Sequence, residues 1–317
     1  MPVKEGDIMN VIDFYGKRRI YFAISLAILV IGVVMSFVNG VQLDIQFKGG
    51  SLIKYSYKGK IDADKAADIT TDLTKRVVST QTTTDLSSGQ KRLIINIAGD
   101  YGLDVKDQEK LDVALKKEFP DAKLKLSEST MVEPFFGKKF LTNGIKAILL
   151  SSVLVVIYVW FRFRRIGGLS AGIMALVALF HDLMVVYVTC VIFRIPIGDS
   201  FVAVALTIIG YSINDTIVIY DRIRENSKKY SRESIETVTN LSIAQSMTRS
   251  INTNLAVLIS VSLVFILAQV NSIESVQSFA LPMAIGSISG CYSTICIAGP
   301  LWVTWKKHKG TEHKIYQ

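Results

Sequence analysis

Long apolar stretches alternate with polar, charged stretches along this 317-residue chain. A helix needs about 20 mostly apolar residues to cross the hydrocarbon core of a bilayer. The stretches near this length are residues 20–38, 144–160, 169–193, 201–220, 250–270 and 279–305. The pattern therefore predicts a membrane protein, mainly α-helical, in which a first transmembrane helix at 20–38 is separated from five more within 142–305.

Lysine and arginine are concentrated in alternate loops between these stretches. They are Lys17, Arg18 and Arg19, then Arg162, Arg164 and Arg165, then Arg222, Arg224, Lys228, Lys229 and Arg232, and finally Lys306, Lys307 and Lys309. Short basic loops stay on the cytoplasmic side of a membrane. We therefore expect the N-terminal segment 1–19, a polar connector at 221–247 and the tail 306–317 to be cytoplasmic. Because no A-x-A-type cleavage site follows the first apolar run, we read that run as a retained anchor.

The long mixed segment 39–141 is then extracytoplasmic, since long translocated domains are largely exempt from the charge rule. Alternating apolar residues predict strands at 41–47, 52–57, 91–98 and 122–132, with a tight turn at Gly49-Gly50. Helical spacing predicts helices over 62–78, with Ala66, Ile69, Leu73 and Val77 on one face, and over 105–119. This order suggests a small α+β ferredoxin-like domain with one extra hairpin.

The composition excludes several classes of function. Half of the residues are hydrophobic and a fifth are charged, with a net charge of +9. In a membrane protein this basic excess reflects cytoplasmic loops, so we expect contact with membrane lipids and no nucleic-acid binding. Cys190, Cys291 and Cys296 lie in apolar stretches and form no readable disulfide or zinc pattern. No Walker loop, catalytic triad or metal-ligand spacing is present, so we expect no enzyme activity, metal or cofactor.

Three ionisable side chains within the apolar stretches are the candidate functional residues, because such groups are costly in hydrocarbon. They are Asp215, Arg249 and Asp182. Tyr211, Ser212 and the adjacent Asn214 give the helix of Asp215 a polar stripe, Gln245 and Asn252 share the face of Arg249, and His181 precedes Asp182. Asp215 and Arg249 can reach similar depth, so an ion pair between them would offset the burial cost of both. The functional interpretation is a proton relay formed by Asp215, Arg249 and Asp182.

Two plainer interpretations stay open for these residues. The Asp–Arg pair could be a static contact that fixes helix packing, and His181 could be a core histidine that bonds between helices. Gly168 and Gly172, like Gly286 and Gly290, have the small-xxx-small spacing that permits close helix contact. That spacing is common in membrane bundles and specifies no function.

Several of these motifs resemble the SecF branch of the SecD/SecF family of bacterial protein-export membrane proteins. The motifs are GYSINDTIVIYDRIREN at 210–226, SMTRSINTN at 246–254, the His181-Asp182 pair, LDIQFKGGSLIKY at 43–55 and EPFFGKKFLTNG at 133–144. They follow the family order over most of the chain. The resemblance implies an RND-superfamily architecture in which six spans pair with six spans of SecD.

The resemblance also implies a function and its partners. Members assist protein translocation across the bacterial plasma membrane with the proton motive force, and Asp215 and Arg249 match the buried residues of the proton path. The implied partners are SecD, the channel subunits SecY, SecE and SecG, the insertase YidC and the exported unfolded polypeptide. Some relatives couple to Na⁺ instead, which stays open here.

Two other functions remain as alternatives. One is half of an RND-type proton-coupled exporter of small solutes or lipids, which would need much larger outer domains than the segment of about 100 residues here. The other is a scaffold for membrane assembly without transport, in which substitution of Asp215 and Arg249 would leave function intact.

Overall fold

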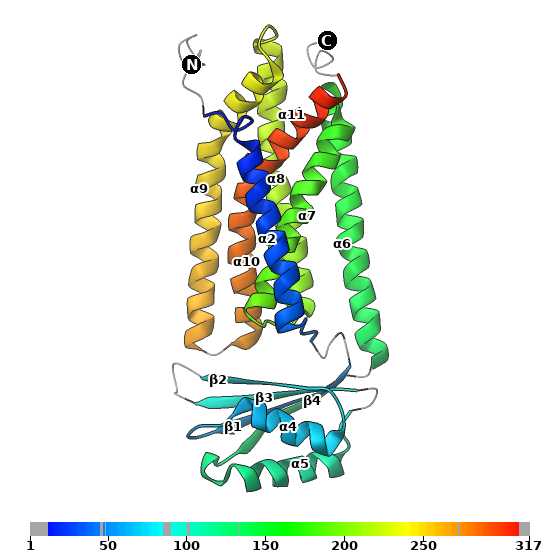
Figure 1. The fold of residues 1–317 in the computed structure, drawn as a ribbon, viewed down its shortest axis with the longest axis vertical. Helices are drawn as coiled ribbons and strands as arrows, with labels where there is room; N and C mark the ends of the chain where they lie inside the picture. The colour runs from blue at the N-terminus through cyan, green and yellow to red at the C-terminus, as the bar shows by residue number, and fades with distance from the viewer. Residues whose placement is uncertain are drawn as a thin grey trace.

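The computed structural model describes residues 12–44, 47, 49–84, 90–99, 102–132, 134–271 and 273–310. A bundle of long helices forms one end of the molecule and a small sheet covered by two helices forms the other (Figure 1). The start of the first long helix and the end of the last one lie at the same end of the bundle, opposite the sheet (Figure 1). This placement is the one expected for an even number of membrane crossings.

Six helical stretches of the described chain are long and apolar enough to span a bilayer. The first five are α2 (Arg18–Asn39), α6 (Pro134–Arg162), α7 (Gly168–Ile192), α8 (Asp199–Lys229) and α9 (Ile235–Val270). The sixth combines α10 (Glu274–Ser293), a π-helical turn η3 (Thr294–Ala298) and α11 (Gly299–His308). A short 3₁₀ turn, η2 (Arg164–Ile166), joins α6 to α7.

The six spans form an inner and an outer group. Most of the apolar stretch of α7 and of the sixth span is buried, as is half of that of α8, whereas α2, α6 and α9 bury little. The outer helices expose leucine, isoleucine and valine side chains along most of their length. Apolar side chains on the outside of a bundle suit contact with lipid tails. The inner helices α7, α8 and α10 therefore form the centre in which polar groups can be shielded.

Glycines set how closely these helices approach. A Cβ on Gly168 would lie 2.2 Å from the carbonyl oxygen of Trp160, so a side chain there would separate α7 from the end of α6. A Cβ on Gly290 would lie 3.3 Å from the Cβ of Ser212, where α10 crosses α8. Small residues let transmembrane backbones approach closely. The two predicted glycine seams therefore do lie at helix contacts.

The outer domain contains β1 (Gly50–Tyr57), α4 (Ala63–Thr74), β2 (Val78–Thr84), β3 (Lys91–Ala98), α5 (Val105–Glu118), η1 (Pro120–Ala122) and β4 (Lys125–Val132). The strands form an antiparallel sheet in the order β2-β3-β1-β4. This βαββαβ succession is that of the ferredoxin-like motif. The described structure therefore agrees with the predicted α+β domain between spans 1 and 2.

Alternation along the strands gives the sheet two different faces. Ile53 and Tyr55 of β1, with Ile95 of β3, pack against Leu111 and Leu115 of α5. The intervening side chains, such as Leu52 and Asn96, point away from α4 and α5, toward the bundle, because neighbouring strand residues face opposite sides of a sheet. The sheet thus lies between its own helices and the membrane bundle (Figure 1).

Four sequence predictions for the outer domain and connector need correction or refinement. Residues 41–44 are not part of the sheet; Leu43 instead forms an isolated parallel bridge with Ile197, and the rest of the predicted strand 41–47 lies largely outside the described residues. The sheet's edge strand β2 was not predicted, because its polar VSTQTTT sequence lacks apolar alternation. α4 ends at Thr74, so Val77 lies beyond the helix and outside the core. The connector 221–247 consists of the ends of α8 and α9 with a short turn between them.

Candidate functional site

Two buried carboxylates lie in the centre of the bundle. Asp182 on α7 has no exposed surface, and Asp215 on α8 is 3% exposed. A charged side chain in the interior of a membrane bundle must find polar partners, because no water solvates it there. The partners differ between the two carboxylates, and each is described in turn.

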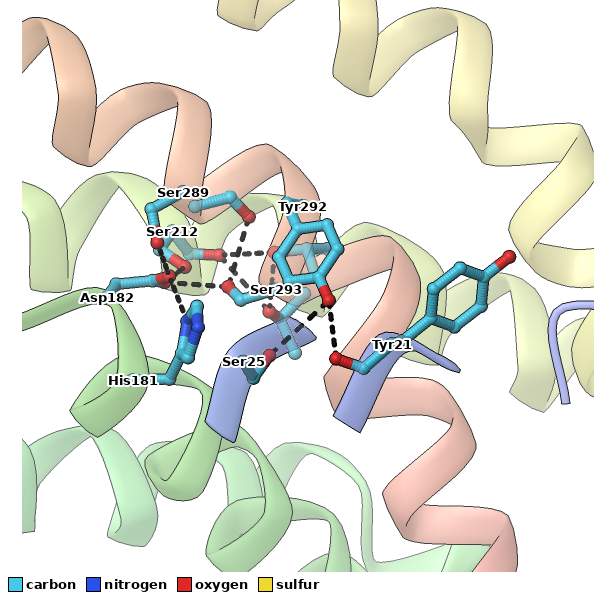
Figure 2. Close-up of polar contacts among 11 residues, drawn as sticks. Tyr21, Ser25, His181, Asp182, Ser212, Ser289, Tyr292 and Ser293 are labelled. Atoms are coloured by element: carbon cyan, nitrogen blue, oxygen red, sulfur yellow. Dashed lines mark hydrogen bonds and ion pairs between the residues drawn. The ribbon is translucent and has the colours of Figure 1, made fainter. Parts of the chain in front are cut away.

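Asp182 is surrounded by hydroxyl groups from two neighbouring helices (Figure 2). Its Oδ2 accepts from Ser212 Oγ of α8 at 2.8 Å and from Ser293 Oγ of α10 at 2.7 Å. Its Oδ1 accepts from Ser289 Oγ of α10 at 2.6 Å and contacts His181 Nδ1 at 3.3 Å. Both oxygens therefore have two polar contacts each. We call Asp182 and these four partners the Asp182 cage.

The local sequence explains why the cage forms. Ser289 and Ser293 are four residues apart on α10, so they lie on one face of the helix. Gly290, on the same helix, allows α10 to approach Ser212 closely. Hydrogen bonds to a charged group contribute about 1.5–3 kcal/mol each, which offsets part of the cost of burying the carboxylate. The cage therefore ties α7, α8 and α10 together at one point.

His181 connects the cage to the first span. Its ring packs against Tyr292, with ring centroids 5.9 Å apart. The hydroxyl of Tyr292 donates to the backbone oxygen of Tyr21 at 2.7 Å and lies 3.4 Å from Ser25 Oγ, both on α2 (Figure 2). His181 Nε2 is buried and has no hydrogen-bond partner among the described residues. A buried ring nitrogen without a partner is a place where an ordered water molecule can be held.

Asp215 has fewer partners than Asp182. Asn254 Nδ2 of α9 donates to Asp215 Oδ2 at 2.7 Å and also to the oxygen of Ser250, one turn earlier, at 2.9 Å. Around this contact, the buried atoms Asn254 Oδ1, Ser250 Oγ and Tyr211 Oη lack hydrogen-bond partners among the described residues. Unpaired buried polar atoms in a native structure commonly bind ordered water. The surroundings of Asp215 thus have three such atoms with free hydrogen-bonding capacity, whereas in the Asp182 cage only His181 Nε2 is a buried atom without a partner among the described residues.

Arg249 does not form the predicted ion pair with Asp215. Its side chain is exposed on the surface of the bundle, and it has no hydrogen bond or ion pair within the described part of the chain. Asn254, one turn along α9, occupies the bonding position that the sequence assigned to Arg249.

The other predicted supporting residues fall in three places. Ser212 lies in the Asp182 cage rather than beside Asp215. Gln245, in the first third of α9, accepts from Asn226 Nδ2 of α8 at 3.0 Å. Asn214 and Asn252 are exposed on the bundle surface. The structure therefore brings His181, Asp182 and Ser212 together, and Tyr211 near Asp215, but separates Asn214, Asn252 and Gln245 from both carboxylates.

Sequence reasoning missed Asn254, Ser289 and Ser293. Asn254 lies within the same SMTRSINTN segment, but only the residues three and four positions after Arg249 were assigned to its face. Ser289 and Ser293 occur as SISGCYS with the i, i+4 spacing of one helix face. A search for hydroxyl pairs at this spacing in apolar helices would have found them.

Asp221, near the basic end of α8, also has partners that the sequence did not indicate. Arg162 of α6 contacts its Oδ2 at 2.9 Å and Arg224 contacts its Oδ1 at 2.8 Å. The contact with Arg162 joins α6 to α8 at the end of the bundle opposite the sheet. Within the described chain, no group of three histidine, cysteine, aspartate or glutamate side chains is arranged to hold a metal ion.

Six spans, an α+β domain inserted after the first, and two carboxylates at the junction of the inner helices define a polytopic membrane protein with a polar bundle centre. The chain matches the family model described as "Protein export membrane protein SecD/SecF, C-terminal" over residues 112–308. It is 32% identical to the protein translocase subunit SecF of Alicyclobacillus acidocaldarius, covering 93% of this chain and 92% of that relative. The chain belongs to the SecD/SecF family.

Further comparisons agree with this membership. The protein translocase subunit SecF of Petrotoga mobilis is 29% identical, over 96% of this chain and 99% of the relative. The SecDF protein of Bacillus subtilis is 32% identical, over 93% of this chain but 38% of the relative. The crystal structure of SecDF, a translocon-associated membrane protein from Thermus thermophilus, superposes with a TM-score of 0.78 at 24% identity, over 95% of this chain and 39% of that chain. The last match shows the fold, and the chain spans about two-fifths of that solved SecDF chain.

Proposed function

We propose that this chain is a SecF-type subunit of a bacterial protein translocase that uses an ion gradient to assist export. Its membership of the SecD/SecF family supports the protein-export part of the proposal. One structural observation supports the ion-coupled part: two carboxylates are buried at the junction of the inner helices of a membrane bundle. Intramembrane carboxylates mark ion pathways and proton relays.

Asp215 is the primary ion-binding group in this proposal. It has one donor, Asn254, among the described residues and is surrounded by buried polar atoms with free hydrogen-bonding capacity. A proton or a Na⁺ ion arriving there would find oxygen ligands without breaking an existing network. Asp182 is the second group of the proposed relay. A proton that binds there would require one of its four existing contacts to rearrange. In this proposal Arg249, on the bundle surface, has a supporting role through its positive charge.

A second membrane protein is expected to cover the surface on which Arg249 lies. Asn214 and Thr207 of α8 and Asn252 of α9 are exposed with it. Polar and cationic side chains within a membrane face protein or a water-filled path rather than lipid, because lipid offers them no hydrogen bonds. The relatives named SecDF indicate SecD as that partner. The channel subunits SecY, SecE and SecG, the insertase YidC and the exported chain are its further proposed associates.

The proposed location is the bacterial plasma membrane with both termini cytoplasmic. Arg18, Arg162, Arg224 and Lys307 all lie near the end of the bundle opposite the sheet, which is the cytoplasmic end by the positive-inside rule. The sheet domain is then extracytoplasmic. A proton crossing about 100 mV toward the cytoplasm releases about 2.3 kcal/mol. That energy shifts a two-state equilibrium by about fifty-fold, enough to drive a rearrangement of the bundle.

The test is Asp215→Asn, which keeps the shape and a hydrogen-bonding side chain but removes the charge. In membrane vesicles with a full translocase, this variant should lose the stimulation of export by an imposed ion gradient while inserting and pairing normally. Gradients of H⁺ and of Na⁺, imposed separately, identify the coupling ion. The control is Asp72→Asn, the same substitution at an exposed position of the outer domain. If Asp215→Asn exports as well as the control under both gradients, the ion-coupling proposal fails.

A further inference from the structure

A cleft separates the outer sheet from the ends of the inner helices, and the ion-coupling site does not use it. The cleft has a volume of about 570 Å³, within the 300–1,000 Å³ typical of ligand-binding pockets. One wall is the sheet face that α4 and α5 leave uncovered. The other wall consists of the turn between α7 and α8, the end of α9 and the beginning of α10.

The sheet wall presents two rows of side chains in cross-strand register. The first row runs Thr130, Leu52, Asn96 across β4, β1 and β3, and the second runs Glu128, Lys54, Ile94, Gln81 from β4 to β2. Lys54 and Glu128 form an ion pair with atoms 3.1 Å apart, so the two charges in this wall neutralise each other. The wall is therefore a mixture of apolar and neutral polar groups.

The rest of the cleft lining includes the charged residues Asp44, Arg194 and Asp199. Phe193, Ile195, Phe265 and Leu281 supply apolar surface, while Gln269 and Gln277 supply carboxamides. With Asn96 and Gln81, four carboxamide side chains line the cleft. Each carboxamide offers both a donor and an acceptor, which matches the N–H and C=O groups of a peptide backbone. Apolar surface between them suits side chains of any apolar type.

The cleft is connected to the membrane helices that hold the two carboxylates. The turn after α7 forms part of its wall, and the linker from α2 to the outer domain is bonded to that turn. Ile197 N donates to Gln42 O at 2.8 Å, and Asp44 N donates to Ile197 O at 3.0 Å. Gln81 of the sheet donates to the backbone oxygen of Arg194 in the same turn, at 3.3 Å. A displacement of α7 or α8 would therefore change the width of the cleft.

We propose that this cleft binds a short extended segment of an unfolded polypeptide on the extracytoplasmic side of the membrane. The carboxamides bond the peptide backbone independently of sequence, and the apolar groups take up its side chains. This inference rests on the proposed function, which supplies an unfolded chain at that surface. It adds the binding site, which the ion-coupling site does not provide.

The experiment places a photoreactive amino acid at Asn96 on the sheet wall and at Gln269 on the α9 wall of the full chain in its membrane complex. An export substrate is arrested during translocation, and its arrest is verified by protease protection. The matched control position is Val113 of α5, which is 66% exposed on the side of the domain away from the cleft. We expect adducts with the arrested chain from both cleft positions and none from Val113. Leu52→Trp, which narrows the cleft, should abolish the adducts, whereas Val113→Trp should leave them.

Three results would overturn the proposal: no adduct from Asn96 or Gln269 with a verified arrested chain, equal adducts from all three positions, or adducts with lipid or another membrane protein alone. These results are separable from a failure of the proposed function. Cross-linking at an arrested stage requires no ion gradient, so it can succeed when Asp215→Asn has no effect. Conversely, loss of gradient stimulation in Asp215→Asn stands even if the cleft is empty.

Discussion

The two buried carboxylates of the bundle differ in how completely the protein satisfies them. Asp182 has two polar contacts on each oxygen, contributed by the two neighbouring inner helices α8 and α10 and by its own neighbour His181. Asp215 has one donor among the described residues, and polar atoms without partners lie around it. A carboxylate whose two oxygens both have several hydrogen-bond partners holds its surroundings in place, because any movement breaks several bonds at once. A carboxylate with one partner leaves room for an incoming ion and its ligands.

This difference assigns distinct roles within one bundle. Asp182 fixes the crossing point of α7, α8 and α10, whereas Asp215 lies between α8 and the outer helix α9. The donor to Asp215 among the described residues, Asn254, belongs to α9. Ion binding at Asp215 would therefore alter the α8–α9 contact before it disturbs the cage.

The largest expected effect follows from removing the carboxylate of the cage. Asp182→Leu removes the acceptor of three buried serine hydroxyls, of which Ser293 keeps a bond to the oxygen of Gly290. Because each buried polar group left unsatisfied costs about 1–3 kcal/mol, we expect a loss of about 3–5 kcal/mol in the free energy of unfolding. Asp215→Leu breaks one hydrogen bond and should cost far less. Thermal or denaturant unfolding of the purified protein in detergent compares the two variants. A less stable Asp215 variant would reverse the comparison.

The serines of α10 should carry a substantial part of that stability. Ser289→Ala with Ser293→Ala removes two hydrogen bonds to a charged group, and we expect a cost of about 2–3 kcal/mol. The matched control is Ser287→Ala, because the Ser287 hydroxyl is also buried but bonds to the oxygen of Ala284 in its own helix. Thermal or denaturant unfolding of the purified variants in detergent measures the stability of the double variant and of the control. Equal stability of the double variant and the control would show that the cage bonds contribute nothing.

The next largest loss of stability is expected where α10 approaches α8 closely, at Gly290. Gly290→Ala places a Cβ 3.3 Å from the Cβ of Ser212, and separating the helices should cost about 1–2 kcal/mol. Gly210→Ala is the control, since a Cβ there meets nothing within 4 Å in the described structure. The measurement is the midpoint of thermal unfolding. A lower midpoint for Gly210→Ala than for Gly290→Ala would contradict the assigned contact.

The sequence predicts the spans well, because a run of apolar residues has one stable arrangement in a bilayer. It also predicts Asp182, Asp215 and His181 as polar groups of the bundle, because these residues lie within the apolar runs. It cannot predict which hydroxyl bonds which carboxylate, because Ser212 is in the stripe of Asp215 by helical spacing yet turns to Asp182 across the α7–α8 contact. It also missed β2, whose polar threonines form an edge strand by pairing with β3 rather than by burial.

Arg249 shows a different limit. The helical spacing correctly separates the two faces of α9, but depth along a helix does not determine on which side of the bundle a residue lies. Asn254, five residues later, faces Asp215, and Arg249 faces outward. Helix rotation is set by packing of neighbouring helices, which a single sequence does not reveal. A partner protein on that surface would place Arg249 in an interface.

Asn252 and Asn254 of α9 provide a direct test of that rotation. Asn254→Ala removes the donor to Asp215, and we expect a loss of about 1 kcal/mol, because hydrogen bonds between transmembrane helices average about 0.6 and reach about 1.7 kcal/mol. Asn252→Ala, at an exposed position two residues earlier, should leave the stability of the purified chain unchanged. Unfolding of both variants in detergent decides this. If Asn252→Ala is the more destabilising change, α9 is rotated differently from the structure.

The smallest expected effect lies outside the membrane, in the ion pair of the cleft wall. Lys54 lowers the pKa of Glu128 below its usual value through a hydrogen bond and its charge. Because the folded-state pKa is the lower one, the pair stabilises the sheet above the unfolded pKa of glutamate and stops doing so as pH falls through the folded value. Since Glu128 is half exposed, the contribution is below about 1 kcal/mol. Hydrogen exchange of β1 and β4 in the intact protein should show slightly faster opening for Glu128→Gln at neutral pH, and no difference from the unsubstituted protein at acidic pH. A pH-independent difference would mean that Glu128 acts through packing rather than charge.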